Sequence, residues 1–153
     1  MSSLGFSRDN YSRCKNSAIY SLAMREHSRQ ELWRKLTQKD LSADVDLNKL
    51  LDELELNDYL NDQRFAESFI RYRVTRGQGK IKIINDLKQR GVSASIIDVS
   101  LAQSDTDWFV LASQTREKKF GKVIAVDYKE KTKQMRFLLG RGFDFEMIRH
   151  AVG

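Results

Sequence analysis

The same helical pattern occurs three times in this chain, at a fixed interval of 51 residues. Its apolar positions are Trp33, Leu36, Leu41, Val45 and Leu50 in the first copy, Ile84, Leu87, Val92, Ile96 and Leu101 in the second, and Met135, Leu138, Phe143, Met147 and Val152 in the third. All of them are apolar, although only 41% of the chain is hydrophobic. A repeat of this length is about one supersecondary unit and is typical of stacked helical arrays. Because such arrays offer long surfaces to extended partners, the repeat favours binding over catalysis.

The residue composition is compatible with long helices. The chain has no Pro and eight Gly, and Pro is the main breaker of helix interiors. We therefore predict an all-α fold, an elongated array of three tandem three-helix repeats with about nine helices in all. The predicted units are residues 1–60, with an N-terminal tail at about 1–8, then 61–104 and 105–153.

Polar residues mark the expected helix ends. Ser28 and Glu31 form a capping box, in which each side chain satisfies a free backbone N–H of the other residue. The other expected N-caps are Asp9, Ser42, Asn61, Ser93, Asp105 and Asp144. Gly91 and Gly142 stand where a left-handed residue ends a helix, and Asp40 occupies the same position in the first unit. The predicted helices cover about residues 10–25, 29–39, 43–56, 62–76, 80–90, 94–103, 106–120 and 128–141, with a ninth from 145 onward.

The chain is basic, and the excess charge is uneven. Its net charge is +6 and its sequence pI is about 9.5. Residues 1–60 carry nine basic and ten acidic side chains, residues 61–100 carry eight and four, and residues 101–153 carry ten and seven. A positive field over the second and third units favours a polyanionic partner, which could be nucleic acid, an acidic protein surface or anionic lipid. The alternative is a basic surface that serves only solubility.

The basic residues recur on predicted helix faces. They form four groups: Arg64, Arg71, Arg73 and Arg76; Lys80, Lys82, Lys88 and Arg90; Lys118, Lys119 and Lys122; and Lys129, Lys133 and Arg136. Arg suits bidentate contact with phosphate or carboxylate, whereas Lys acts as a point charge. The alternative is a solvated face with local helix pairs to Glu67, Asp86 and Glu130. Tyr72 and Phe120 could stack a base, but the alternative for both is a place in the core. Tyr72 completes an i, i+4, i+7 core stripe with Phe65 and Phe69.

Candidate catalytic groups are few. Cys14 lies beside Arg13 and Lys15, which could depress its pKa, but a lone Cys is also a common small core residue. His27 and His150 lie far apart without partners at metal spacing, and His27 is expected to pack at a turn. The Gly77-Gln78-Gly79-Lys80 stretch lacks the spacing of a P-loop; it is either a phosphate-contacting helix start or a plain interhelical turn. We expect no enzyme activity, no cofactor and no metal.

The sequence start and the cysteine content indicate a location. Cys14 is the only cysteine, so no internal disulfide can form. The first residues lack an apolar signal region, and no stretch approaches the roughly 18 apolar residues of a membrane span. We expect a soluble cytoplasmic protein that is not bound to a membrane.

Three stretches together resemble one known family. They are Arg25-Glu26-His27-Ser28-Arg29-Gln30-Glu31-Leu32, Tyr59-Leu60-Asn61-Asp62-Gln63-Arg64-Phe65-Ala66-Glu67-Ser68-Phe69, and Gly77-Gln78-Gly79 leading to Arg90-Gly91-Val92. The combination is similar to the RecX regulatory proteins of bacteria, the modulators of RecA recombinase. The resemblance extends from about residue 18 to near the end of the chain, with Asp58 standing where family members often have Gly.

The resemblance implies tandem three-helix repeats and a regulatory function. Such a protein, expected to be a monomer, would bind the RecA filament on single-stranded DNA, with double-stranded DNA as a further candidate. It would inhibit ATP hydrolysis and strand exchange, and so modulate DNA repair and the SOS response. The residues expected to contact these partners are Arg25, Arg29, Arg64, Arg71, Arg73, Arg76, Lys80, Lys82, Lys88, Lys118, Lys119, Lys129, Lys133 and Arg136.

Two alternatives remain open. A stand-alone DNA-binding module would compete with RecA for single strands, and its affinity would fall steeply with salt. A protein-only scaffold would hold an acidic partner and would not bind DNA at any salt concentration.

Overall fold

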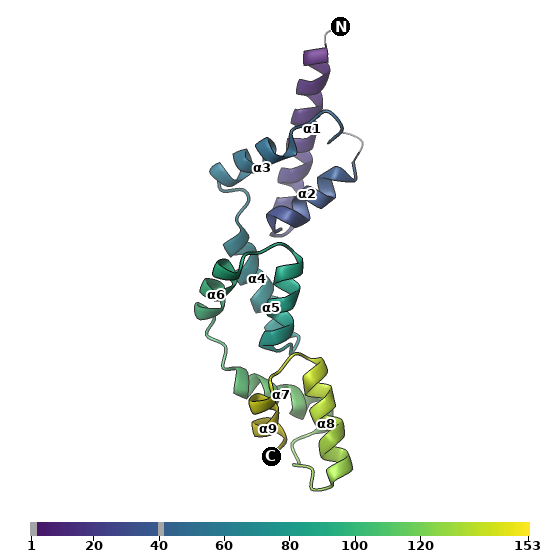
Figure 1. Cartoon of the computed structure of the whole chain (residues 1–153), viewed down its shortest axis with the longest axis vertical. Helices are drawn as coiled ribbons and strands as arrows, with labels where there is room; N and C mark the ends of the chain where they lie inside the picture. Colours follow the sequence, from purple (N-terminus) through teal and green to yellow (C-terminus); the bar gives the residue numbers. More distant parts are fainter. Residues whose placement is uncertain (1–2, 40–41) are drawn as a thin grey trace.

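The computed structural model describes residues 3–39 and 42–153, and within them the chain forms nine helices and no strand. The helices are α1 (Ser3–Met24), α2 (Arg29–Thr37), α3 (Leu47–Leu56), α4 (Asp62–Thr75), α5 (Lys80–Gln89), α6 (Ala94–Ala102), α7 (Trp108–Phe120), α8 (Tyr128–Gly140) and α9 (Phe145–Val152). They stack three by three into an elongated, slightly curved column with the two termini at opposite ends (Figure 1). The predicted all-α array of tandem three-helix repeats is confirmed.

Each group of three helices encloses its own small core. Cys14, Leu36 and Leu50 belong to the first core, Ile70 and Leu87 to the second, and further buried residues to the third. Among the described positions of the 51-residue pattern, all but one pack in or against these cores. The exception is Trp33, which is 43% exposed, and Leu41 lies outside the described residues. The apolar repeat therefore encodes three cores in series.

Most of the predicted helix caps are present. Ser28 and Glu31 form the capping box, and Asn61, Ser93 and Asp144 each accept a hydrogen bond from the third residue of the helix that they precede. These side-chain oxygens satisfy backbone N–H groups that have no partner within the helix.

Three predicted helix starts are wrong. The chain is already helical at Ser3, so Asp9 lies inside α1. The Ser42 hydroxyl donates to the Lys39 carbonyl, and α3 begins later, where Asp46 accepts from the Lys49 N–H at 3.2 Å. Helix α7 is capped by Asp107 instead of Asp105. It starts at Trp108, whose ring packs against both the second and the third core.

Left-handed residues close several helices. Gly91 and Gly142 have φ values of 81° and 96°, as expected for the residue after a helix. Asp58 has a φ of 62° and is the one non-glycine residue with positive φ in the described part of the chain. Its side chain therefore tolerates the conformation that glycine supplies more easily. The corresponding prediction for Asp40 lies outside the described residues.

Candidate functional site

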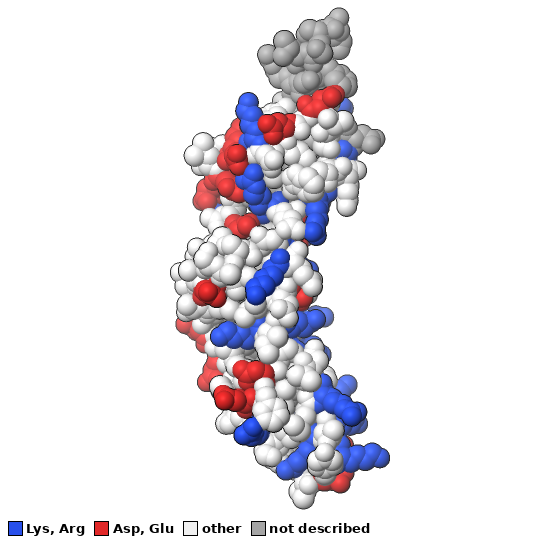
Figure 2. Space-filling model, in the orientation of Figure 1, with Lys and Arg blue, Asp and Glu red and all other residues white. Residues whose placement is uncertain are grey.

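Charge is distributed unevenly over the column. In the view of Figure 2, blue basic side chains gather toward the edge that carries α5 and α8, and red acidic side chains are more frequent along the opposite edge. This arrangement agrees with the excess of basic residues beyond residue 60. A long basic edge can interact with several charges of an extended polyanion.

Part of the predicted basic set forms ion pairs within the protein. Arg29 pairs with Asp52 and Glu55 at 2.8 and 2.9 Å. Arg64 pairs with Glu26 at 2.6 Å, and its hydrogen bond to that carboxylate raises the pKa of the Arg64 guanidinium.

Two further arginines of the set, and one lysine, also have acidic neighbours. Arg73 lies 2.6 Å from Asp86, and Arg25 lies 3.3 Å from Glu31. Lys82 approaches Asp86 at 4.0 Å. The charges of these cations are therefore at least partly compensated within the protein.

The remaining predicted cations make no ion pair with any residue that the structure describes. They are Arg71, Arg76, Lys80, Lys88, Lys118, Lys119, Lys129, Lys133 and Arg136. All of them are exposed except Lys80, which is half-buried. Three of these cations lie over aromatic rings instead: Arg76 over Tyr72, Lys119 over Phe137 and Lys133 over Phe120. Tyr72 is 59% exposed, so its predicted place in the core stripe is wrong, whereas Phe65 is buried and Phe69 half-buried.

Successive units are joined twice at equivalent positions of the repeat, by a side-chain donor in one joint and a backbone donor in the other. At the first joint, the Ser28 hydroxyl donates to the Arg90 carbonyl at 2.7 Å. At the second joint, the Gly79 N–H donates to the Arg141 carbonyl at 2.7 Å. Ser28 and Gly79 are 51 residues apart, and so are Arg90 and Arg141. In both joints the start of the second helix of one unit meets the end of the second helix of the next.

The glycine-rich turn is explained by the second joint. A Cβ atom on Gly79 would lie 2.4 Å from the backbone of Gly142, so only glycine permits this approach. The N–H groups of Gly79 and Ile81 donate to the carbonyls of Arg141 and Gly142. Because these donors are occupied, the hypothesis that they bind a phosphate is wrong, and the stretch is an interhelical turn.

The structure also shows the surroundings of the candidate catalytic residues. Cys14 is fully buried, and burial raises the pKa of its thiol, so the hypothesis of an activated thiol is wrong. His27 is buried at the turn between α1 and α2, with Nδ1 3.0 Å from the Arg25 carbonyl. Among the described residues, no group of three or more His, Cys, Asp or Glu side chains is arranged to hold a metal ion. No helix within residues 3–39 and 42–153 is long and apolar enough to cross a membrane.

Sequence reasoning missed Arg141 as a candidate contact residue. It ends α8, donates to the Arg76 carbonyl at 3.2 Å and lies 5.2 Å from the Phe137 ring. The sequence signal that could have identified Arg141 was the 51-residue repeat, because Arg141 stands 51 residues after the basic residue Arg90. In the structure, Arg90 lies at the equivalent place in the first joint.

Comparison with protein families finds the same repeats. Three family models match in order: RecX, first three-helix domain, over residues 14–45; RecX, second three-helix domain, over residues 61–101; and RecX, third three-helix domain, over residues 105–152. Among curated relatives, a Regulatory protein RecX of Vibrio campbellii is 42% identical over 141 residues, covering 90% of this chain and 88% of the relative. Another, from Halorhodospira halophila, is 38% identical over 137 residues and covers 90% and 84%.

Solved structures have the same fold. The crystal structure of RecX from Lactobacillus salivarius superposes with a TM-score of 0.76 at 22% identity, over 95% of this chain and 96% of that one. A second structure, described as regulatory protein RecX, has a TM-score of 0.78 at 19% identity, over 93% of this chain and 72% of that one.

Proposed function

The chain belongs to the RecX family of regulatory proteins, and from this premise we propose that it binds the RecA filament on single-stranded DNA and inhibits it. Bound along the filament, the protein hinders ATP hydrolysis and strand exchange. It thereby modulates recombinational DNA repair and the SOS response.

The shape of the molecule supports this proposal. A column of three units with a core in each, stacked end to end, presents one continuous surface to an extended partner (Figure 1). A protein of this shape can contact several subunits of a filament at once, and the binding free energies of linked contacts reinforce one another.

The single observation that carries the proposal most strongly, beside family membership, is the set of exposed cations without an internal counter-ion. Lys129 and Arg136 lie two turns apart on α8, both exposed and without an ion pair to any described residue. A cation in water loses little by remaining unpaired, but it gains when it meets a phosphate or carboxylate in a less hydrated interface.

The test is DNA-dependent ATP hydrolysis by preformed RecA filaments, with this protein titrated far below the amount of RecA. We expect inhibition at a few molecules per hundred RecA, because one bound molecule affects a run of neighbouring subunits. Inhibition only near the amount that coats the DNA would instead support the alternative, a DNA-binding module that competes for single strands.

Two charge-reversal variants test whether the exposed face of α8 contacts the filament. Lys129→Glu with Arg136→Glu should raise the half-inhibitory concentration about tenfold or more, at about 1 kcal/mol or somewhat more per reversed charge. The control is Arg34→Glu with Lys35→Glu, which reverses two exposed charges on α2. Equal inhibition by both variants would exclude the α8 face as a contact surface.

A further inference from the structure

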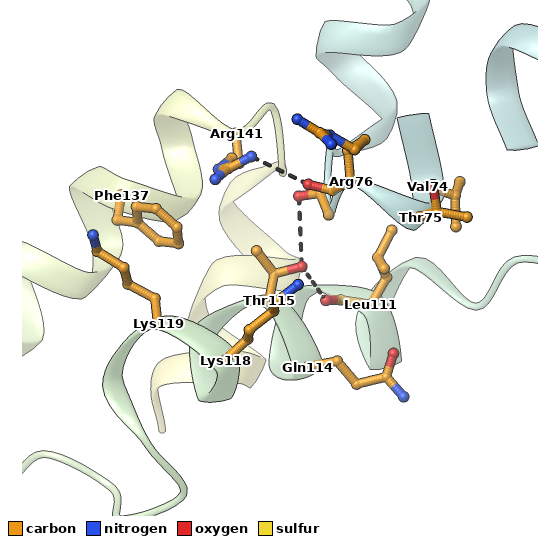
Figure 3. A pocket seen from close by; sticks show the side chains of 11 residues that line it. Val74, Thr75, Arg76, Leu111, Gln114, Thr115, Lys118, Lys119, Phe137 and Arg141 are labelled. Atoms are coloured by element: carbon orange, nitrogen blue, oxygen red, sulfur yellow. Dashed lines mark hydrogen bonds between the residues drawn. The ribbon is translucent and has the colours of Figure 1, made fainter. Parts of the chain in front are cut away.

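A pocket of about 530 Å³ lies at the joint between the second and third units. Its four cations come from three elements: Arg76 ends α4, Lys118 and Lys119 lie in the last turn of α7, and Arg141 ends α8 (Figure 3). The rest of the lining includes apolar side chains of Val74, Leu111 and Phe137. Its volume falls in the range of roughly 300 to 1,000 Å³ that is usual for small-ligand sites.

The first joint has an equivalent pocket of about 380 Å³. The repeat relates most of the residues that line the two pockets. Arg25 and Arg90 of the first correspond to Arg76 and Arg141 of the second, each 51 positions later. Five further lining residues of each pocket come from the first helix of the following unit and correspond at a constant offset of 46: Phe65, Ser68, Phe69, Tyr72 and Arg73 correspond to Leu111, Gln114, Thr115, Lys118 and Lys119.

In the first pocket the cations are neutralised internally. Glu31 lies 3.3 Å from Arg25 and 3.6 Å from Arg90. Asp86 pairs with Arg73 at 2.6 Å. This pocket therefore has no need of an external anion.

In the second pocket these counter-ions have been replaced. Lys82 and Phe137 stand 51 residues after Glu31 and Asp86, and Gly77 stands 51 residues after Glu26, the other acidic residue that lines the first pocket. No acidic residue lines this pocket among the residues described, and its four cations make no ion pair there. Four like charges around one cavity repel each other, and the repulsion is relieved when an anion enters.

We propose that the second pocket binds a phosphodiester group of single-stranded DNA, with the adjoining base against its apolar wall. This inference rests on the proposed function and names the part of the molecule that contacts the DNA within the filament. In this arrangement Arg76, at the end of α4, and Arg141, at the end of α8, contact the phosphate. Lys118 and Lys119 add further positive charge around it.

The surroundings favour DNA over an acidic protein segment. Phe137 and Phe120 pack edge to face at 5.4 Å, and Arg141, Lys119 and Lys133 lie over these two rings. The cations thus continue out of the pocket along α8, as a chain of successive phosphates requires. Arg76 also lies over the exposed ring of Tyr72, and an aromatic ring beside cations is the usual arrangement for stacking a base of a single strand.

The test is binding of a fluorescein-labelled oligothymidylate to the full-length protein without RecA, followed by fluorescence anisotropy at several salt concentrations. The decisive variant is Lys82→Glu, which restores the acidic residue that Glu31 provides in the first joint. The new carboxylate is expected to pair with Arg141, so Kd should rise about tenfold or more. The melting temperature is measured as well, and Kd is determined well below it, because Lys82 lies 4.0 Å from Asp86 and its reversal brings two carboxylates together. The matched control is Lys35→Glu, the same charge change at an exposed site on α2, which should change Kd by less than about threefold.

A second variant provides an independent test in case Lys82→Glu does not fold. Lys118→Glu with Lys119→Glu should weaken oligonucleotide binding at least as much and lower the slope of log K against log salt by about 0.7 per lost phosphate contact. Its control is Arg34→Glu with Lys35→Glu, two consecutive cations in the last turn of α2 as Lys118 and Lys119 are in that of α7.

Several results would overturn the inference. Equal Kd values for pocket variants and their controls would remove the pocket from DNA binding. Pocket-dependent binding of polyglutamate, with no binding of the oligonucleotide, would identify an acidic protein as the occupant. The RecA ATPase assay separates the two proposals: inhibition without pocket-dependent DNA binding refutes only this inference, and pocket-dependent DNA binding without inhibition refutes only the proposed function.

Discussion

His27 is a buried ionisable residue in the turn between the first two helices. Its Nδ1 lies 3.0 Å from the Arg25 carbonyl, which can only accept, so Nδ1 carries the proton. Its Nε2 is buried without a hydrogen-bond partner among the described residues. Desolvation by burial lowers the pKa of His27, because a protonated imidazole would leave a charged N–H without an acceptor.

This burial predicts a pH dependence of stability. The unfolded chain gains a proton on His27 near its ordinary pKa of about 6.5, whereas the folded protein gains it only at lower pH. The contribution is therefore fully present above that value and is lost as pH falls toward the folded pKa, at up to about 1.4 kcal/mol per pH unit. Urea unfolding at pH 7.5 and 5.5 should show a larger loss for the wild type than for His27→Asn. As a control, His150→Gln changes an exposed histidine and should lose as much unfolding free energy between the two pH values as the wild type does. If His27→Asn also loses as much as the wild type, the prediction is contradicted.

At the scale of a helix, one side chain both caps α2 and ties two units together. The Ser28 hydroxyl oxygen accepts from the Glu31 N–H at 3.0 Å and donates to the Arg90 carbonyl at 2.7 Å. Ser93 caps α6 in the same manner at 3.3 Å but is exposed and has no bond to another unit.

This difference predicts unequal costs of the same substitution. Ser93→Ala should lower the free energy of unfolding by about 1 kcal/mol, the value of a cap. Ser28→Ala should cost about 2 to 3 kcal/mol, because the half-buried Arg90 carbonyl also loses its donor. Urea titrations measure the free energy of unfolding of each variant. Equal losses of free energy would mean that the inter-unit hydrogen bond adds no net stability.

At the scale of the whole molecule, the second joint depends on a close backbone approach. In Gly79→Ala the new Cβ would meet the Gly142 carbonyl group at 2.4 Å, and that backbone can retreat only if the two units move apart. We expect a loss of about 2 to 4 kcal/mol in unfolding free energy and a changed maximum dimension in small-angle X-ray scattering. Gly140→Ala is the control, because nothing lies within 4 Å of its Cβ, and it should be neutral or slightly stabilising. Identical scattering and stability for both variants would mean that the joint is not tightly packed.

Features with a local cause could be predicted from the sequence. The 51-residue apolar pattern predicted the stacked three-helix units, and Gly91 and Gly142 predicted two helix ends. Where two possible cap residues stand close together, the sequence does not show which one caps the helix. This is so for Ser42 and Asp46 before α3, and for Asp105 and Asp107 before α7. Packing decided: Leu47 and Trp108, the first residues of α3 and α7, contact the cores.

The sequence alone determined the fold class, the number of units and the sign of the charge, because periodicity and composition depend on near neighbours or on sums. Only the tertiary structure decided which cations are compensated. Arg29 and Arg64 meet carboxylates more than 20 residues away, whereas Arg76 and Arg141 surround a cavity without one. An ion pair requires two side chains within about 4 Å, and that proximity arises only when the units stack.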